Sequence, residues 1–303
     1  MRIYFIIMIG LLAGIGGYIV YVLGVSDGDV PAKDIEMVLE FPFKNVFPGE
    51  ERYFDKSIVI TDATYIFSSY PQITGNPALI HHGIIMHSGA ENRYCGADSP
   101  VMSTITATGT ELNEYNLEDT PYGVFLKKGD QLYMSVHISN PGDKIESGMF
   151  KWTLRGSANR KPVGATYFGV VDFCKIEQKK SGVPYEFVIP SGITRYEKTM
   201  ERPYIIPEDG TLVAWGGHLH TYGISLTFIK NGKEMDTFFA EKNTRDSVDR
   251  VRSVYIPFRI LDVPISLKKG DIIDMRAVYE KPVELFYPGA MANGYLFIDF
   301  ESR

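Results

Sequence analysis

Short apolar runs separated by turn-forming residues make up most of this chain. The segments 56–70, 123–139, 165–174, 211–217, 223–239 and 271–280 are rich in β-branched and aromatic residues, and Gly, Pro or Asn stand between them. Asn231-Gly232 lies between two such runs, and both residues tolerate positive φ, which predicts a two-residue hairpin. No long amphipathic helix pattern follows residue 24. The pattern therefore predicts an all-β protein.

An internal repeat suggests how these strands are organised. The five residues LKKGD occur at 126–130 and again at 267–271, and Met134 and Met275 follow at the same spacing. A His-His-Gly segment precedes the first copy, and a His-Leu-His segment precedes the second at a similar distance. Two halves with the same order of parts predict two tandem antiparallel β-sandwich domains, at 35–178 and 179–303.

The N-terminus has a different pattern. Residues 3–24 form an uncharged apolar stretch of about 22 residues, long enough to cross a bilayer as a helix. We predict an uncleaved transmembrane signal anchor at 1–24 and a polar linker at 25–34, because no clear cleavage site is present. A cleaved signal peptide and a buried core helix remain as alternatives. Arg2 before the span places the rest of the chain outside the cytoplasm, in a periplasmic, extracellular or lumenal compartment.

Composition narrows the partners and the redox setting. The formal net charge is −6, and no basic patch is visible, so we expect no nucleic-acid partner. Cys95 and Cys174 are the two cysteines of the chain. An oxidising compartment would allow them to form a disulfide, but two free, buried thiols fit the sequence equally well.

The chemistry of the chain centres on its six histidines. His218 and His220 have the H-x-H spacing that puts two imidazoles on one face of a strand, where they can bind one metal ion. His81 and His82 are adjacent and would face opposite sides of a regular strand. They can share an ion only if the strand is distorted, which the following Gly83 would permit. Two half-exposed polar residues are the alternative interpretation of H-x-H.

The two remaining histidines are His87 and His137. His87 is six residues beyond His81, about 20 Å along an extended strand, and is expected to be a surface or hydrogen-bonding residue. His137 ends the strand that follows the first LKKGD.

Four segments follow one another along the chain, His-His-Gly at 81–83, "MSVHIS" at 134–139, "GGHLHTYG" at 216–223 and "PGAMANGYLFIDF" at 288–300. Their order and spacing resemble those of the copper type II, ascorbate-dependent monooxygenases. This family includes peptidylglycine α-hydroxylating monooxygenase and dopamine β-monooxygenase. The resemblance covers about residues 50–303.

The resemblance implies a fold, two metal sites and a reaction. Each of two jelly-roll-like β-sandwich domains would hold one copper beside a solvent-filled cleft. One copper, which relays electrons, would have His81, His82 and His137 as ligands. The copper that activates O2 would have His218, His220 and Met291, a soft thioether ligand that favours Cu(I).

The same resemblance implies the reactants. Asn293 and Tyr295, which follow Met291 in "MANGY", would lie on the substrate side. Ascorbate or another one-electron donor would supply electrons, and O2 would hydroxylate a C–H bond of a small or peptide-like substrate.

Several positions depart from the family pattern. Gly216 stands where peptide-amidating members carry an Arg that binds the substrate carboxylate, so a glycine-extended peptide is a poor substrate prediction. Gly83 and Ser135 replace residues common around the first copper, and Ser88 stands where a bridging Cys would be expected.

From the resemblance and the apolar N-terminus we predict a membrane-anchored copper monooxygenase. A copper protein for storage, delivery or electron transfer is the alternative, and a structural β-sandwich with incidental histidines is a third possibility.

Overall fold

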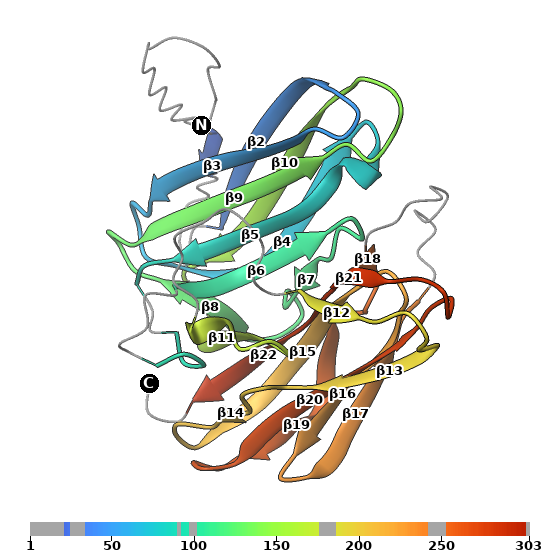
Figure 1. Cartoon of the computed structure of the whole chain (residues 1–303). Coiled ribbons are helices and arrows are strands. Elements are labelled where there is room, and N and C mark those ends of the chain that lie inside the picture. Colours follow the sequence, from blue (N-terminus) through green and yellow to red (C-terminus); the bar gives the residue numbers. More distant parts are fainter. Residues whose placement is uncertain are drawn as a thin grey trace.

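The computed structural model describes residues 21–24, 34–89, 92–96, 102–175, 186–241 and 253–300. Strands dominate this part of the chain, and its two helical segments are the short 3-10 turns η1 (Pro77–Leu79) and η2 (Phe173–Lys175). The predicted all-β class is confirmed (Figure 1). Within the described ranges, no helix has the length and apolar character needed to cross a bilayer.

The predicted membrane anchor lies almost entirely outside the described residues. Its last four residues are a strand, β1 (Tyr21–Gly24), which pairs antiparallel with β2 (Ile35–Val46). The prediction of a helix over residues 1–24 is therefore wrong for residues 21–24. Residues 1–20 and most of the 25–34 linker are outside the part of the chain that the structure describes.

The N-terminal half packs two sheets against each other. A four-stranded sheet has the order β3-β9-β5-β6 and faces the first part of a long eleven-stranded sheet, where the order is β2-β10-β4-β8. The core between them is built around Trp152, Phe41, Phe150 and aliphatic side chains of both sheets. The strands are β3 (Glu51–Val59), β4 (Thr64–Thr74), β5 (Ile80–His87), β6 (Ser103–Gly109), β7 (Tyr115–Asn116), β8 (Tyr122–Leu126), β9 (Gln131–Ser139) and β10 (Glu146–Ser157).

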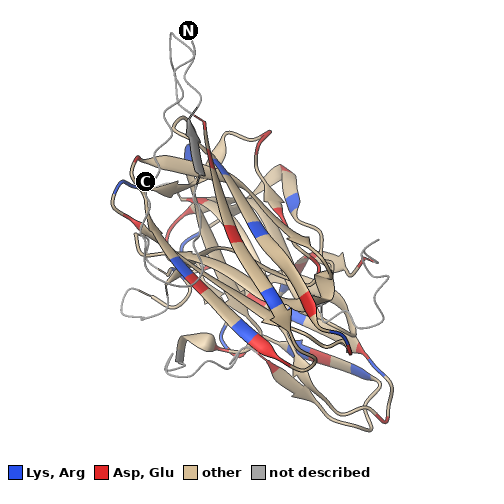
Figure 2. Ribbon diagram, turned by 90° about the horizontal axis from the view of Figure 1, so that it is seen from above, with Lys and Arg blue, Asp and Glu red and all other residues tan. Residues whose placement is uncertain are grey.

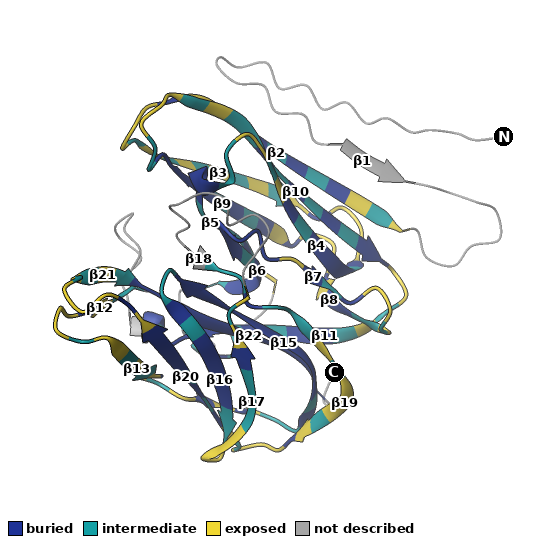
Figure 3. Cartoon of the chain, turned by 90° about the vertical axis from the view of Figure 1, so that its right-hand side faces the viewer, coloured by how far each residue is buried: buried dark blue, intermediate teal, exposed yellow. Residues whose placement is uncertain are grey.

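The C-terminal half repeats this arrangement. The sheet β13-β20-β16-β17, with β14 beside β20, faces the second part of the long sheet, where β11, β22 and β15 are neighbours. Trp215, Phe228 and Phe238 lie in a second core between them. Figure 3 shows β15, β16 and β20 largely in the colour of buried residues. The strands are β11 (Lys161–Gly169), β12 (Phe187–Ile189), β13 (Arg195–Thr199), β14 (Tyr204–Ile205), β15 (Gly210–His220), β16 (Gly223–Lys230), β17 (Lys233–Phe239), β18 (Ser253–Val254), β19 (Arg259–Leu267), β20 (Ile272–Glu280), β21 (Tyr287–Ala290) and β22 (Ala292–Phe300).

One sheet runs through both halves. Residues 161–163 of β11 pair parallel with residues 122–124 of β8, while residues 164–169 pair antiparallel with β22. β11 precedes the predicted boundary at 178/179, yet most of its pairing is with the C-terminal half. The boundary itself stays a prediction.

The sequence repeat corresponds to a structural repeat. In each LKKGD turn, the N–H of the first Lys donates to the Asp carboxylate, at 2.9 Å for Asp130 and 2.8 Å for Asp271. The turn glycines have φ of 93° and 89°, conformations that favour glycine. Each turn also exchanges two backbone hydrogen bonds with an isoleucine, Ile60 or Ile206. The two copies of the repeated turn therefore form the same set of hydrogen bonds.

The structure confirms the predicted hairpin and decides between the two alternatives for the cysteines. Asn231-Gly232 joins β16 to β17 with φ of 51° and 78°, as expected for a tight hairpin. Cys95 and Cys174 form a disulfide with Cα atoms 5.3 Å apart. Such bridges are typical of proteins outside the cytoplasm, so the disulfide supports an extracytoplasmic location.

Charges are mixed over the strands. Figure 2 shows acidic and basic residues interspersed along the ribbons. The expectation that nucleic acid is not a partner stays a prediction.

Candidate metal centre

Five of the six histidines come together where the two halves face each other. His81 and His82 lie at the start of β5 and His137 lies near the end of β9, both in the N-terminal four-stranded sheet. His218 and His220 end β15 in the long sheet. Among the described residues, three groups have ligand atoms within 4.8 Å of one another, namely His81/His82/His137, His82/His218/His220 and His81/Glu186/His220.

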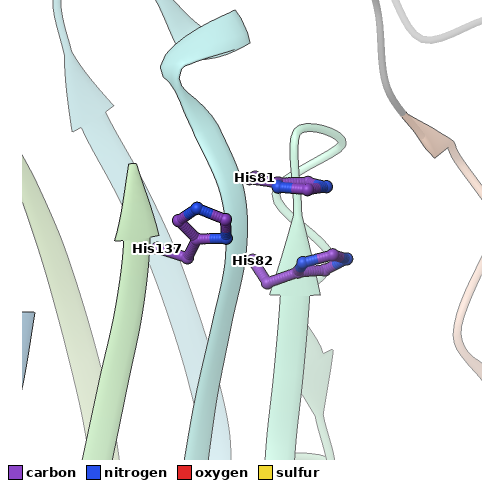
Figure 4. A group of neighbouring side chains, drawn as sticks. All are labelled: His81, His82 and His137. Atoms are coloured by element: carbon purple, nitrogen blue, oxygen red, sulfur yellow. The ribbon is translucent and has the colours of Figure 1, made fainter. Parts of the chain in front are cut away.

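A β-bulge lets the adjacent histidines share one side of β5. In the pairing of β5 with β9, Ile80 lies opposite Ile138 but His82 lies opposite His137, so His81 is the extra residue. A bulge places two consecutive side chains on the side that a regular strand would give to one. The rings of His81 and His82 stack with centroids 4.2 Å apart and project together from the strand (Figure 4). The strand distortion required by the sequence is present.

Gly83 has a role different from the one expected. The distortion falls on His81, and Gly83 is not among the residues with positive φ. A Cβ atom at Gly83 would lie 2.9 Å from the Trp152 ring. The glycine therefore allows Trp152, whose Nε1–H donates to Ser69, to fill the core directly behind the histidine pair.

His137 is held from two sides. Its ring stacks on Tyr53 of the neighbouring strand β3, with centroids 4.1 Å apart and an interplanar angle of 13°. Its Nε2 is 3.5 Å from a carboxylate oxygen of Glu51. The centroid of His81 lies 4.7 Å from that of His137, which completes a compact group of three imidazoles.

Hydrogen bonds fix the ring orientation of the other two histidines. Nδ1 of His218 is 2.7 Å from Oε1 of Glu111, and Nδ1 of His220 is 2.7 Å from the carbonyl oxygen of Gly289. A carbonyl and a carboxylate accept, so both Nδ1 atoms carry a proton, and in the neutral form of each ring Nε2 presents a lone pair. This is the outer-shell arrangement typical of metal-binding histidines. Nε2 of His218 is buried and has no hydrogen-bond partner among the described residues, as expected for a ligand atom.

The C-terminal motif, residues 291–295, lies alongside the end of β15. His218 pairs with Asn293 and Gly216 pairs with Tyr295, and the N–H of His220 donates to the carbonyl oxygen of Met291 at 3.0 Å. Directly opposed residues of an antiparallel pair share a face, so Met291, Asn293 and Tyr295 belong to the face of the two histidines. Met291 is 2% exposed, and its carbonyl oxygen also accepts from the Tyr279 hydroxyl.

Gly216 provides space for an aromatic ring. A Cβ atom at this position would lie 2.5–2.6 Å from the ring and hydroxyl of Tyr295. The space over Gly216 is therefore occupied by the Tyr295 ring.

The two histidine groups are in contact. Nε2 of His82 is 3.0 Å from Nε2 of His220, and the ring centroids of His82 and His218 are 5.8 Å apart. This contact differs from the expected arrangement, in which a solvent-filled cleft separates the two metal sites. Burial, reinforced by the imidazoles of His220 and His81, holds the pKa of His82 well below its usual value, so its ring is neutral at pH 7.

His87 does not belong to the cluster. It lies at the far end of β5, opposite Leu132 and Ser103, and is absent from the metal-binding groups of the described residues. The predicted separation from His81 is confirmed, but the side chain is 2% exposed rather than on the surface.

The sequence offered no sign of Glu111, the residue that contacts His218. Glu111 lies in the turn after β6, 107 residues before its partner, and its side chain is 1% exposed. In the same turn, the Thr110 hydroxyl donates to Ile80 and Asn113 donates to Gly217. This turn thus joins the start of β5 to β15, and no local motif marks it.

The two histidine pairs do not follow the structural repeat of the two halves. His81 and His82 begin β5, in one layer, whereas His218 and His220 end β15, in the other. β5 and β16 have equivalent places in the matching orders β3-β9-β5-β6 and β13-β20-β16-β17. The first pair follows the connection from β4 to β5, whereas the second pair precedes the equivalent connection from β15 to β16. The two pairs therefore do not occupy equivalent positions in the two halves.

Comparisons with known proteins do not assign a family. No family model and no curated protein sequence matches the chain. A β-porphyranase of glycoside hydrolase family 86 from the human gut bacterium Bacteroides plebeius is similar over 92% of this chain and 36% of its own, with 9% identity and a TM-score of 0.23. This chain thus spans about a third of the porphyranase.

A candidate secreted protein from Parabacteroides distasonis ATCC 8503 is similar over 88% of this chain and 89% of its own, with 8% identity and a TM-score of 0.21. Similarities at this level identify neither fold nor function.

Proposed function

We propose that this protein is a copper-dependent monooxygenase of the ascorbate-dependent type, with its active part outside the cytoplasm. The observation that carries the proposal is the convergence of five histidines from both halves of the chain, two of them with Nδ1 held by oxygen acceptors. Neutral imidazoles suit copper, and a buried methionine beside them favours Cu(I). Membrane anchoring through the apolar residues that precede β1 is part of the same proposal.

The residues divide into two ligand sets. His218, His220 and Met291 would hold the copper that reacts with O2, while His81, His82 and His137 would hold the copper that relays an electron. Copper supplies one-electron chemistry with O2 and a reductant such as ascorbate. The protein contributes orientation, through Glu111 and the Gly289 carbonyl, and a buried setting.

Asn293 and Tyr295 share the face of the second ligand set and would position the substrate C–H bond. Both polar atoms of the Asn293 side chain are buried and have no hydrogen-bond partner in the part of the chain that the structure describes, which supports a role in binding a polar group.

One observation favours a copper carrier without oxygenase activity. The imidazoles of His82 and His220 are in direct contact, whereas the oxygenase resemblance implies two sites separated by a solvent-filled cleft. Storage, delivery or electron transfer does not require that separation. The two functions predict different results in one assay. An oxygenase consumes O2 with ascorbate only when its substrate is present, whereas a carrier binds copper and gives no substrate-dependent uptake.

The decisive experiment measures copper and oxygen on the same purified full-length protein. We expect copper to bind tightly and a screen of small and peptide-like C–H substrates to yield ascorbate-driven O2 uptake with a hydroxylated product. Copper binding without uptake would favour the carrier. Failure to bind copper would reject both functions.

Met291→Ile tests the methionine. We expect this variant to lose turnover while copper bound through the first-half histidines remains. Met149→Ile, a change on β10 outside the cluster, is the matched control. Full turnover in Met291→Ile would remove the methionine from the ligand set.

A further inference from the structure

We infer that His82, His218 and His220 bind one metal ion between the two halves of the protein. This inference rests on the proposal that the histidine cluster binds copper. It differs from that proposal by moving His82 from the first-half ligand set to a site shared with the second half.

The distances support a shared site. Ligand atoms of His82, His218 and His220 all lie within 4.8 Å of one another, a spacing that three ligands of one ion can adopt. Nε2 of His82 and Nε2 of His220 are 3.0 Å apart, and the centroids of His218 and His220 are separated by 5.1 Å. His82 comes from the N-terminal half and the other two from the C-terminal half, so such an ion would connect the halves directly.

The tautomers prepare this site for a metal. Because the Gly289 carbonyl and the Glu111 carboxylate accept from Nδ1 of His220 and His218, both Nε2 atoms present lone pairs in the neutral rings. Three imidazole nitrogens form a donor set that suits copper. Glu111 comes from the N-terminal half, so the second half's ligand is oriented by the first half even without an ion.

Sharing has a consequence for stoichiometry. His82 belongs to both the His81/His82/His137 group and the His82/His218/His220 group, and a neutral imidazole has one lone pair, with which it can ligate one ion at a time. An ion at the shared site therefore leaves His81 and His137 as the remaining pair of the first set. We expect the first equivalent of copper to bind much more tightly than the second.

The first test isolates the shared site in the full-length chain. In a His81→Ala/His137→Ala background, we expect one Cu(I) to bind, measured anaerobically by competition with a chromophoric Cu(I) chelator. Adding His82→Ala should weaken this ion by more than about 100-fold, beyond the range for loss of an outer-shell partner. His87→Ala, on the same strand but outside the cluster, should leave binding unchanged.

Two results would overturn the inference. If His82→Ala leaves the affinity intact and Met291→Ile abolishes it, the ion uses the separate set His218/His220/Met291, and the proposed function survives without sharing. If the wild-type chain binds no copper, the proposed function fails together with the shared site.

A second measurement avoids variants that fail to fold. X-ray absorption at the copper edge, on wild-type protein with one equivalent of Cu(I), distinguishes the shared site from the set His218/His220/Met291. Two nitrogens and one sulfur would overturn the shared site. Three nitrogen scatterers without sulfur fit both three-histidine groups, and the same spectrum in the His81→Ala/His137→Ala variant would assign them to the shared site.

Discussion

Oε1 of Glu111 lies 2.7 Å from Nδ1 of His218, and the two residues are 107 positions apart in the chain. The carboxylate is buried, accepts a second hydrogen bond from the N–H of Gly109, and belongs to the other half of the protein. It therefore acts as a positioning residue, which holds one tautomer of a candidate metal ligand and contributes to the contact between the halves.

Glu111→Gln should weaken metal binding while leaving the fold intact. The amide can still accept from His218, but without the negative charge that strengthens this hydrogen bond and raises the basicity of the ligand. We expect Cu(I) affinity to fall by about 10–100-fold, measured by chelator competition. Glu114→Gln, at an exposed carboxylate in the same turn, is the matched control. Equal affinities in the two variants would show that Glu111 has no positioning role.

Gly216→Ala should destabilise the protein through the Tyr295 ring. The added methyl group would overlap the ring, and overpacking of this kind costs about 1–3 kcal/mol of unfolding free energy. Chemical denaturation of the single and double variants measures the coupling. In a Tyr295→Ala background the same substitution should cost much less. An equal cost in both backgrounds would place the strain elsewhere.

Asp271 should make stability depend on pH in the acid range. Burial alone would raise the pKa of its carboxyl, but hydrogen bonds from Lys230, the backbone of Lys268 and Asn231 lower the pKa to about 2. A lowered pKa means that the contribution to stability is present above the unfolded value of about 3.9 and is lost as the pH falls towards 2.

We expect Asp271→Asn to lose about 1–2 kcal/mol at pH 7, and this deficit to shrink between pH 4 and pH 3. Urea denaturation across this range measures the difference. Asp143→Asn, at an exposed turn position, is the control. A deficit that stays constant with pH would show that the carboxyl does not titrate as inferred.

Loss of the disulfide should destabilise the native state. Cys95 and Cys174 close a loop with a sequence separation of 79, and a bridge of this kind contributes about 2–4 kcal/mol in most proteins. The Cys95→Ser/Cys174→Ser variant should therefore unfold at lower urea concentration than the oxidised wild type. Reduced wild-type protein should match the variant. Coincident transitions of oxidised and reduced wild type would indicate that the bridge adds no stability.

Local patterns accounted for much of the architecture. The LKKGD turns and the Asn231-Gly232 hairpin were visible in sequence because each depends on residues close together in the chain. The same is true of the shared face of His218 and His220, which follows from the two-residue period of a strand. Gly83 was misinterpreted because its neighbour Trp152 is distant in sequence.

The sequence by itself determined the all-β class, the duplicated turns and the set of imidazoles able to bind a metal. It could do so because backbone preferences and side-chain alternation act over a few residues. Only the tertiary structure decided that His82 contacts His220, that Glu111 orients His218 and that Tyr295 occupies the space over Gly216. These contacts join residues of different strands or different halves, and packing between sheets, rather than local preference, brings them together.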